Sequence, residues 1–221
     1  MSVLFFGSIS TLADTSELQR RAFNEAFQAH GLDWNWSRED YVSMLGSNGG
    51  KDRIADFARE RGQEVDAAEV HATKSAIFQE LLSSQDVSAR PGVLDTVRRA
   101  KDDGTRVGFV TTTSGDNIAA LLRALSPDIT SDTFDVIVDS SSVSTGKPDP
   151  AAYQYALDTL GEDAAGAVAI EDNEGGVRSA TAAGLTCIAF PNQNTADADF
   201  SGAATTVEAL RPDDVVALIK A

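Results

Sequence analysis

Short apolar runs that alternate with amphipathic stretches are the feature that most constrains how this chain can fold. Five such runs end close to Gly, Ser, Thr or Asp, at residues 3–6, 107–110, 134–138, 167–170 and 186–190. Apolar runs of this length are typical of strands that are buried on both faces of a parallel sheet. Amphipathic stretches of helical length lie between the later runs. The chain is therefore expected to form an α/β fold with a doubly wound parallel sheet.

Residues 16–86 break this alternation. They contain no convincing strand pattern, but show helical periodicity in four stretches, at 17–29, 38–45, 51–61 and 67–82. The turn signal Arg-Pro-Gly at 90–92 then marks the return to the alternating pattern. We therefore expect a core domain made of residues 1–15 plus 87–221, and a helical domain of residues 16–86 inserted after the first strand.

Composition argues against several classes of partner. A net charge of -16 disfavours nucleic acid and anionic membranes, whose binding requires clustered cations, but permits a small anion in a local pocket.

No apolar run approaches the ~20 residues of a membrane span. The run at 3–6 is too short for a signal peptide and lacks basic residues before it. Cys187 is the single cysteine and cannot form an internal disulfide, so we expect a cytoplasmic protein. The oligomeric state is not indicated.

Polar side chains follow several of the apolar runs. Thr111 and Thr112 follow the second run, Lys147 lies beyond the third, and Glu171 and Asp172 follow the fourth. In a parallel sheet the carboxyl ends of the strands meet at one edge, and ligands bind there. Hydroxyls, a lysine and paired carboxylates are groups that bind phosphate together with a divalent cation. The sequence therefore predicts a phosphate site at this edge.

These residues stand in four motifs that resemble those of the haloacid dehalogenase superfamily, in its CbbY-type and beta-phosphoglucomutase-like branch. Residues 11–15 (Thr-Leu-Ala-Asp-Thr) are similar to the end of the first family motif, Asp-x-Asp-Gly-Thr-Leu-x-Asp-Thr/Ser. Thr111 matches the hydroxyl of the second motif, and Lys147 matches the lysine of the third. Residues 171–176 are similar to the fourth motif, Glu-Asp-Ser-x-x-Gly. The resemblance covers nearly the whole chain and implies a Rossmann-like core in which Thr111, Thr112 and Lys147 bind phosphate.

The resemblance also covers the helical insert, which matches the mobile cap of the family. Residues 49–53 (Gly-Gly-Lys-Asp-Arg) look like the CbbY-type substrate loop, which implies ligand contacts from Gly50, Lys51 and Arg53. The alternative is that Lys51 and Arg53 are ordinary exposed charges at the start of a helix. The ligand that the family implies is a phosphorylated small molecule such as a sugar phosphate.

The first motif departs from the family pattern at its centre. Aligning residues 11–15 with the family puts Gly7 where the nucleophilic aspartate belongs and Ile9 where the acid/base aspartate belongs. In the family the first aspartate attacks phosphorus and the second protonates the leaving oxygen. Glycine and isoleucine can do neither, and acid–base help alone is worth roughly 10²–10⁴-fold. Strand alternation further predicts that Gly7 and Ile9 share one side and that Ser8 faces away.

The same departure weakens the metal site that the resemblance implies. The family holds Mg²⁺ with the nucleophile carboxylate, a main-chain oxygen two residues later and the aspartate of the fourth motif. Here the main-chain oxygen of Ile9 and the carboxylate of Asp172 remain, with Glu171 beside them. Without metal, Lys147, Glu171 and Asp172 sum to -1, so a phosphate ligand is expected to need an accompanying cation.

Three functions remain open at this point. The first is a binding protein for a phosphorylated small molecule that has lost the phosphoryl-transfer chemistry. The second is an Mg²⁺-dependent sugar-phosphate phosphatase or phosphomutase of low activity that uses a modified mechanism. The third is a scaffold whose pocket is not used. The missing aspartates favour the first, and whether the chain is an enzyme stays undecided.

Overall fold

A six-stranded parallel sheet forms the centre of the molecule. The computed structural model describes residues 2–45 and 49–219 of the chain. The strand order is β3-β2-β1-β4-β5-β6, and each neighbouring pair is parallel. The strands are β1 (Val3–Phe6), β2 (Arg106–Val110), β3 (Val136–Val138), β4 (Ala167–Glu171), β5 (Thr186–Ala189) and β6 (Thr205–Thr206). The predicted doubly wound parallel sheet is confirmed, although β6, which is short and exposed, was not predicted because it contains no apolar residue.

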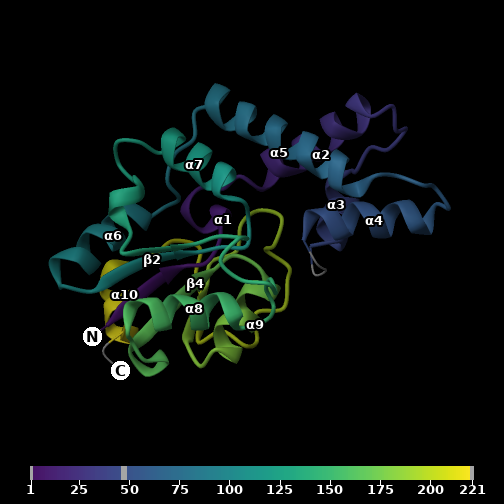
Figure 1. Cartoon of the computed structure of the whole chain (residues 1–221). Coiled ribbons are helices and arrows are strands. Elements are labelled where there is room, and N and C mark those ends of the chain that lie inside the picture. The colour runs from purple at the N-terminus through teal and green to yellow at the C-terminus, as the bar shows by residue number, and fades with distance from the viewer. Residues whose placement is uncertain (1, 46–48, 220–221) are drawn as a thin grey trace.

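Helices cover both faces of this sheet (Figure 1). One face packs against α6 (Val93–Asp102), α7 (Gly115–Ala124) and α10 (Pro212–Ile219), and the other packs against α8 (Ala151–Leu160) and α9 (Glu174–Ala182). Successive residues of β1 alternate between these faces, with Leu4 and Phe6 in the first cluster and Val3 and Phe5 in the second. Two short 3₁₀ turns, η1 (Ser131–Thr133) and η2 (Ala164–Gly166), precede β3 and β4. This explains why the predicted strands are apolar on both sides.

Two glycines are required by the local backbone. Gly92 has φ 82°, and a Cβ atom there would lie 1.9 Å from the main-chain oxygen of Leu210. Gly161 follows the last residue of α8 with φ 64°, the left-handed conformation that commonly ends a helix. The first of these positions belongs to the turn predicted at residues 90–92.

The segment after β1 forms a second, helical lobe at the upper right of Figure 1. Its helices, here called the cap helices, are α2 (Ser16–Ala29), α3 (Arg38–Ser43), α4 (Gly50–Glu60) and α5 (Ala67–Ser84). They enclose an aromatic cluster of their own, in which the ring of Trp36 lies 4.9 Å from Phe23 and 4.7 Å from Phe27. Trp34 and Trp36 are therefore packing residues of this cluster. Among the described residues, no helix combines the length and the apolar character that crossing a membrane requires. The domain boundaries at residues 16 and 86 stay a prediction.

The turn after β1 differs from the prediction. β1 ends at Phe6, and the short helix α1 (Ile9–Leu12) begins three residues later with Ser8 as its N-cap. The side chain of Ser8 accepts from the amide of Thr11 at 3.2 Å, while the Thr11 side chain interacts with the Ser8 backbone. This capping box satisfies the free amides at the start of α1 and ends the strand conformation. The expectation that Ser8 faces away from the site is therefore wrong, since strand alternation does not extend to residue 8.

Candidate functional site

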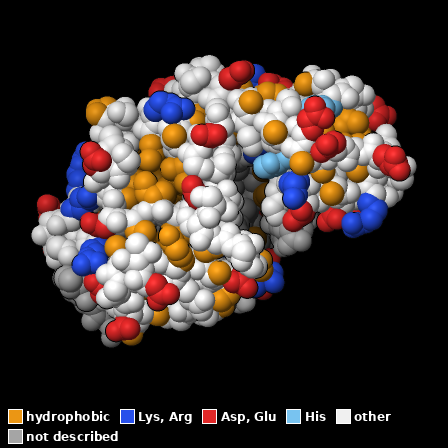
Figure 2. Space-filling view, viewed as in Figure 1, with side chains coloured by type: hydrophobic (Ala, Val, Ile, Leu, Met, Phe, Trp, Pro, Cys, Tyr) orange, Lys and Arg blue, Asp and Glu red, His pale blue; other side chains and the backbone are white. Residues whose placement is uncertain are grey.

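A cleft of about 1080 Å³ separates the carboxyl edge of the sheet from the cap helices (Figure 2). All the residues that the sequence predicted for the site line this cleft except Gly7 and Glu171. Its core wall includes Ile9, Thr111, Thr112, Lys147 and Asp172, and its cap wall includes Gly50, Lys51 and Arg53. Gly7 lies in a smaller adjoining cavity of about 220 Å³, which Thr111, Thr112 and Lys147 also line. The volume suits a small-molecule ligand.

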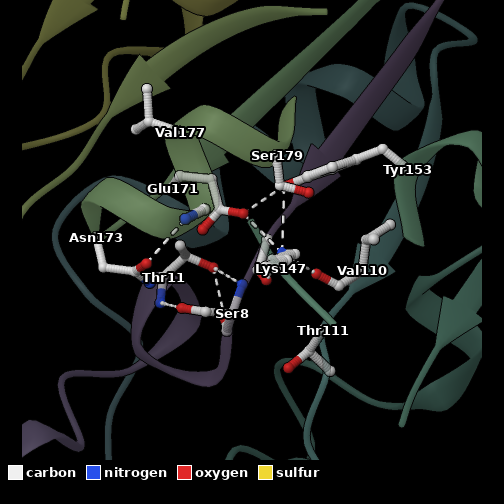
Figure 3. A network of polar contacts seen from close by, with 12 residues as sticks. Ser8, Thr11, Val110, Thr111, Lys147, Tyr153, Glu171, Asn173, Val177 and Ser179 are labelled. Carbon is white, nitrogen blue, oxygen red and sulfur yellow. Dashed lines mark hydrogen bonds and ion pairs between the residues drawn. The ribbon is translucent and has the colours of Figure 1, made fainter. Parts of the chain in front are cut away.

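Glu171 lies beneath the floor of the cleft. It is the last residue of β4 and is fully buried, because it points toward α8. Its Oε1 accepts from Nζ of Lys147 at 2.6 Å and from the hydroxyl of Tyr153 at 2.6 Å (Figure 3). Oε2 accepts no hydrogen bond from the described residues. Burial raises the pKa of Glu171, an effect that the nearby Lys147 opposes, and burial also raises the pKa of Tyr153. The tyrosine therefore remains a protonated donor to this carboxylate.

The Glu171 carboxylate fills the space next to Gly7. The pairing of Phe6 with Ile170 in β1 and β4 places Gly7 beside Glu171 at the end of both strands. A Cβ atom at position 7 would lie 2.2 Å from Cδ and Oε1 of Glu171 and 2.4 Å from the Tyr153 hydroxyl. On the other side, a Cβ atom on the glycine at position 176 would lie 2.1 Å from Oε2. Glu171 thus occupies the position where any side chain at residue 7 would begin.

Lys147 is held by groups of the core. Besides Glu171, its Nζ donates to the main-chain oxygen of Val110 at 2.7 Å and to that of Gly7. A lysine ammonium carries three N–H donors, and these three acceptors use all of them. The sequence predicted a phosphate-binding role for Lys147. The structure places it at the edge of the cleft with its donors directed at the core.

Asp172 follows Glu171 and is nearly buried, with 4% of its surface exposed. Its Oδ1 accepts from Oγ of Ser8 at 2.7 Å and from Nδ2 of Asn173 at 2.8 Å, and its Oδ2 accepts from Nδ2 of Asn192 at 2.7 Å. The capping box of α1 was a readable signal for Ser8. Asn192 carried none, since only the tertiary fold brings the loop after β5 to Asp172.

The threonines after β2 are positioned by the start of α7. Thr111 is 5% exposed, and its amide donates to the main-chain oxygen of Val138 at 2.9 Å. Its hydroxyl accepts from the amide of Thr113 at 3.3 Å, and Ser114 is the N-cap of α7. Thr112 is exposed at the cleft. The predicted phosphate-binding role of Thr111 and Thr112 is compatible with these contacts, and Ser114 caps the helix beside them.

The cap wall contributes several cations to the cleft, of which the sequence predicted Lys51 and Arg53 but not Lys74. Lys74 of α5 is 5% exposed, lines the cleft and donates to Oε1 of Gln19. Burial, together with the charge of Arg53, lowers the pKa of Lys74 to about 7. Burial also lowers the pKa of His71 to about 4, so that this ring is neutral at pH 7. Lys74 and His71 lie three residues apart in a predicted helix, and that spacing was the available signal.

Arg53 belongs to the same wall. It is 9% exposed, its Nε donates to the main-chain oxygen of Met44 at 3.1 Å, and its guanidinium lies 5.6 Å from the ring centre of Tyr41. Lys51 is exposed at the start of α4 and also lines the cleft. With Lys74, these residues make the cap wall the cationic side of the cleft.

One loop connects the cap helices to Asp172. Arg38 of α3 donates through Nε to Oδ1 of Asn194 at 2.7 Å and through a second nitrogen to the main-chain oxygen of Gln193. Asn194 in turn donates to Oε1 of Glu17 in α2 at 2.7 Å. Since Asn192 of the same loop binds Asp172, residues 192–194 join both sides of the cleft.

The comparisons with known proteins agree on one family. The model of haloacid dehalogenase-like hydrolases matches residues 10–190. Protein CbbY of Cereibacter sphaeroides is 40% identical over 206 residues, which cover 92% of this chain and 90% of that protein. Protein CbbY of Rhodobacter capsulatus is 39% identical, with coverage of 92% and 91%.

Solved structures of CbbY from Rhodobacter sphaeroides are similar over nearly the whole chain. One is a complex with phosphate, and another is a variant in complex with xylulose-(1,5)bisphosphate. Each superposes with a TM-score of 0.87 at 39% identity and covers 95% of both chains.

Proposed function

Because the chain belongs to the haloacid dehalogenase-like hydrolase family, we propose that it binds a phosphorylated sugar in this cleft without the phosphoryl transfer of the family. The observation that carries the proposal is the Glu171 carboxylate, which lies where a nucleophile at position 7 would lie and is paired with Lys147. An attacking carboxylate has to reach the cleft. Glu171 is instead buried below it.

Within the described part of the core wall, we find no other group placed to act as the nucleophile. Ile9 has no ionisable atom at the position aligned with the family's acid/base. Ser8 faces the cleft, but its hydroxyl proton is donated to Asp172 and its oxygen caps α1. A serine needs a neighbouring base and a positioned leaving-group acid to attack phosphorus. Asp172 is the carboxylate that could serve as that base, but it already accepts the Ser8 hydroxyl, and Asp116, the other carboxylate on the core wall, lies in the first turn of α7 and not at a strand end.

Binding is supported by the charge of the cap wall and by the relatives. CbbY from Rhodobacter sphaeroides has been solved with phosphate and with a sugar bisphosphate. In this chain, Lys51, Arg53 and Lys74 line the cap side of the cleft. Charge-assisted hydrogen bonds to phosphate are about twice as strong as neutral ones. We therefore propose a sugar carrying at least one phosphate, with an anionic group against these cap cations.

A second candidate, a phosphatase of low activity, is favoured by one observation. Asp172 and Ser8 both line the cleft, so a water molecule bound there would have a carboxylate acceptor. This candidate predicts slow phosphate release that is lost in the Asp172→Asn variant. The binding proposal predicts no release in either protein.

Calorimetric titration with xylulose 1,5-bisphosphate, followed by a colorimetric assay for released phosphate, tests the proposal. We expect saturable binding and no phosphate release above that of buffer. Lys74→Gln removes a charge-assisted hydrogen bond worth about 1.5–3 kcal/mol, so it should weaken binding about 10–100-fold.

The matched control is Lys101→Gln, which changes an exposed lysine at the end of α6 and should leave affinity unchanged. Absence of binding would contradict the proposal. So would phosphate release that persists through purification and is lost in the Asp172→Asn variant.

A further inference from the structure

The proposed function leaves open whether the ligand needs the Mg²⁺ that proteins of this family generally use. We infer that this chain binds its ligand without Mg²⁺, because the ion pair of Lys147 with Glu171 has replaced the metal as the charge balance of the core. The inference rests on the proposed function.

Residues 7, 171 and 172 stand at the strand ends where the resemblance places metal ligands, and two of these three positions do not direct a carboxylate at the cleft. Residue 7 is glycine. Glu171 is buried, and Lys147 and Tyr153 both donate to its Oε1 at 2.6 Å. Its carbon Cδ and both oxygens lie between the backbones of residues 7 and 176, which have no side chains to displace it. For Glu171 to bind a metal it would have to leave its ion pair, and Lys147, whose side chain is only 10% exposed, would then lack a carboxylate partner.

Asp172 is the third position, and it is already provided with donors. Ser8, Asn173 and Asn192 donate three hydrogen bonds to its two oxygens. A cation at these oxygens would face the amide hydrogens of two asparagines. One carboxylate can suffice for Mg²⁺ only when further oxygens complete the octahedron.

The main-chain oxygen of Ile9, predicted as a weak metal ligand, does not fit that role well. It accepts the amide of Ala13 at 3.2 Å as part of α1. Within residues 2–45 and 49–219, no group of three or more His, Cys, Asp or Glu side chains is arranged to hold a metal ion. The donor set therefore does not fit Mg²⁺, and the cap cations Arg53 and Lys74 supply positive charge to an anionic ligand instead.

Titration of the full chain with Mn²⁺ alone, followed by electron paramagnetic resonance, tests the metal directly. Mn²⁺ is a spectroscopically visible substitute for Mg²⁺. Because the chain has a net charge of -16, weak binding to surface acids is expected in any case. The informative comparison is therefore with Asp172→Asn. We expect the two titration curves to coincide. A site that is present in the natural chain and absent in the variant would overturn the inference.

Inorganic phosphate, titrated with EDTA or with excess Mg²⁺, tests the ligand. We expect affinities that agree within about twofold, and a gain of tenfold or more with Mg²⁺ would overturn the inference. Absence of phosphate binding in both conditions counts against the proposed function. The inference is then decided by the Mn²⁺ titration, so the two failures are distinguishable.

A gain of metal binding provides the complementary test. Combining Gly7→Asp with Glu171→Ala removes the buried carboxylate and places a new one in the same space, beside Asp172. In the folded double variant, checked by circular dichroism, we expect Mn²⁺ affinity to rise at least tenfold. A folded double variant with unchanged affinity would show that the position of Glu171 is not what excludes the metal.

Discussion

Replacing Gly7 with alanine tests the packing that underlies the account. The new Cβ would lie 2.2 Å from the Glu171 carboxylate and 2.4 Å from the Tyr153 hydroxyl, far inside van der Waals contact. Neither group can move without disturbing the buried ion pair with Lys147. Overpacking of this kind typically costs about 1–3 kcal/mol, so we expect a loss of about 2 kcal/mol in the free energy of unfolding. For a chain of this size, that corresponds to a fall of about 4–8 °C in Tm.

Urea unfolding followed by far-ultraviolet circular dichroism measures this loss. Tryptophan fluorescence is less suitable, because Trp34 and Trp36 both lie among the cap helices and report on the aromatic cluster there. Gly146→Ala is the matched control. Its Cβ would lie 3.7 Å from the nearest atoms, those of Thr112, which is an ordinary contact. We expect this control to change stability by less than about 0.5 kcal/mol.

A double-mutant cycle identifies Glu171 as the source of the collision. Glu171→Ala alone breaks an ion pair whose lysine side chain is only 10% exposed and should cost about 3 kcal/mol. In that background the Tyr153 hydroxyl, 2.4 Å from the new Cβ, can shift into the space that the carboxylate leaves, so the cost of Gly7→Ala should fall to about 0.5 kcal/mol or less. The coupling energy is then about 1.5–2 kcal/mol. Equal costs of Gly7→Ala in both backgrounds would refute the reasoning.

Three further predictions concern the cleft. Because burial lowers the pKa of Lys74 to about 7, this lysine is charged at pH 6 and largely neutral at pH 8. Sulfate does not titrate in this range, so calorimetry should show that it binds more weakly at pH 8 than at pH 6. The Lys74→Gln variant should abolish that difference. Arg38→Ala should speed amide hydrogen exchange in residues 192–195, whereas Arg59→Ala, an exposed cap arginine, should not. Ser8→Ala removes an N-cap and a hydrogen bond to Asp172, so the free energy of unfolding should fall by about 1–2 kcal/mol, and an unchanged urea midpoint would contradict this assignment.

The strands and cap helices were predictable because local pattern determines them. The central residues of β1 and β2 are buried on both faces, and such runs are apolar whatever surrounds them. The approximate positions of the four cap helices followed from helical periodicity. β6 could not be predicted, since Thr205 and Thr206 are exposed and pair with β5 only through the backbone.

The composition of the cleft was predictable, but the direction of its side chains was not. Edge topology brought Thr111, Lys147 and Asp172 together as expected. The sequence could not show that Glu171 turns into the space beside Gly7, because that depends on contacts with α8 and on an ion pair across the sheet edge. Nor could alternation place Ser8, because a helix cap, and not a strand, determines its direction.

The most direct test of the central claim is phosphorus NMR of a sugar bisphosphate mixed with a stoichiometric amount of the protein. It observes binding and turnover in one sample. The account predicts that the ligand resonances shift or broaden while their total intensity stays constant overnight and no inorganic phosphate appears. A resonance of inorganic phosphate that grows in proportion to the protein, and is lost in the Asp172→Asn variant, would contradict it.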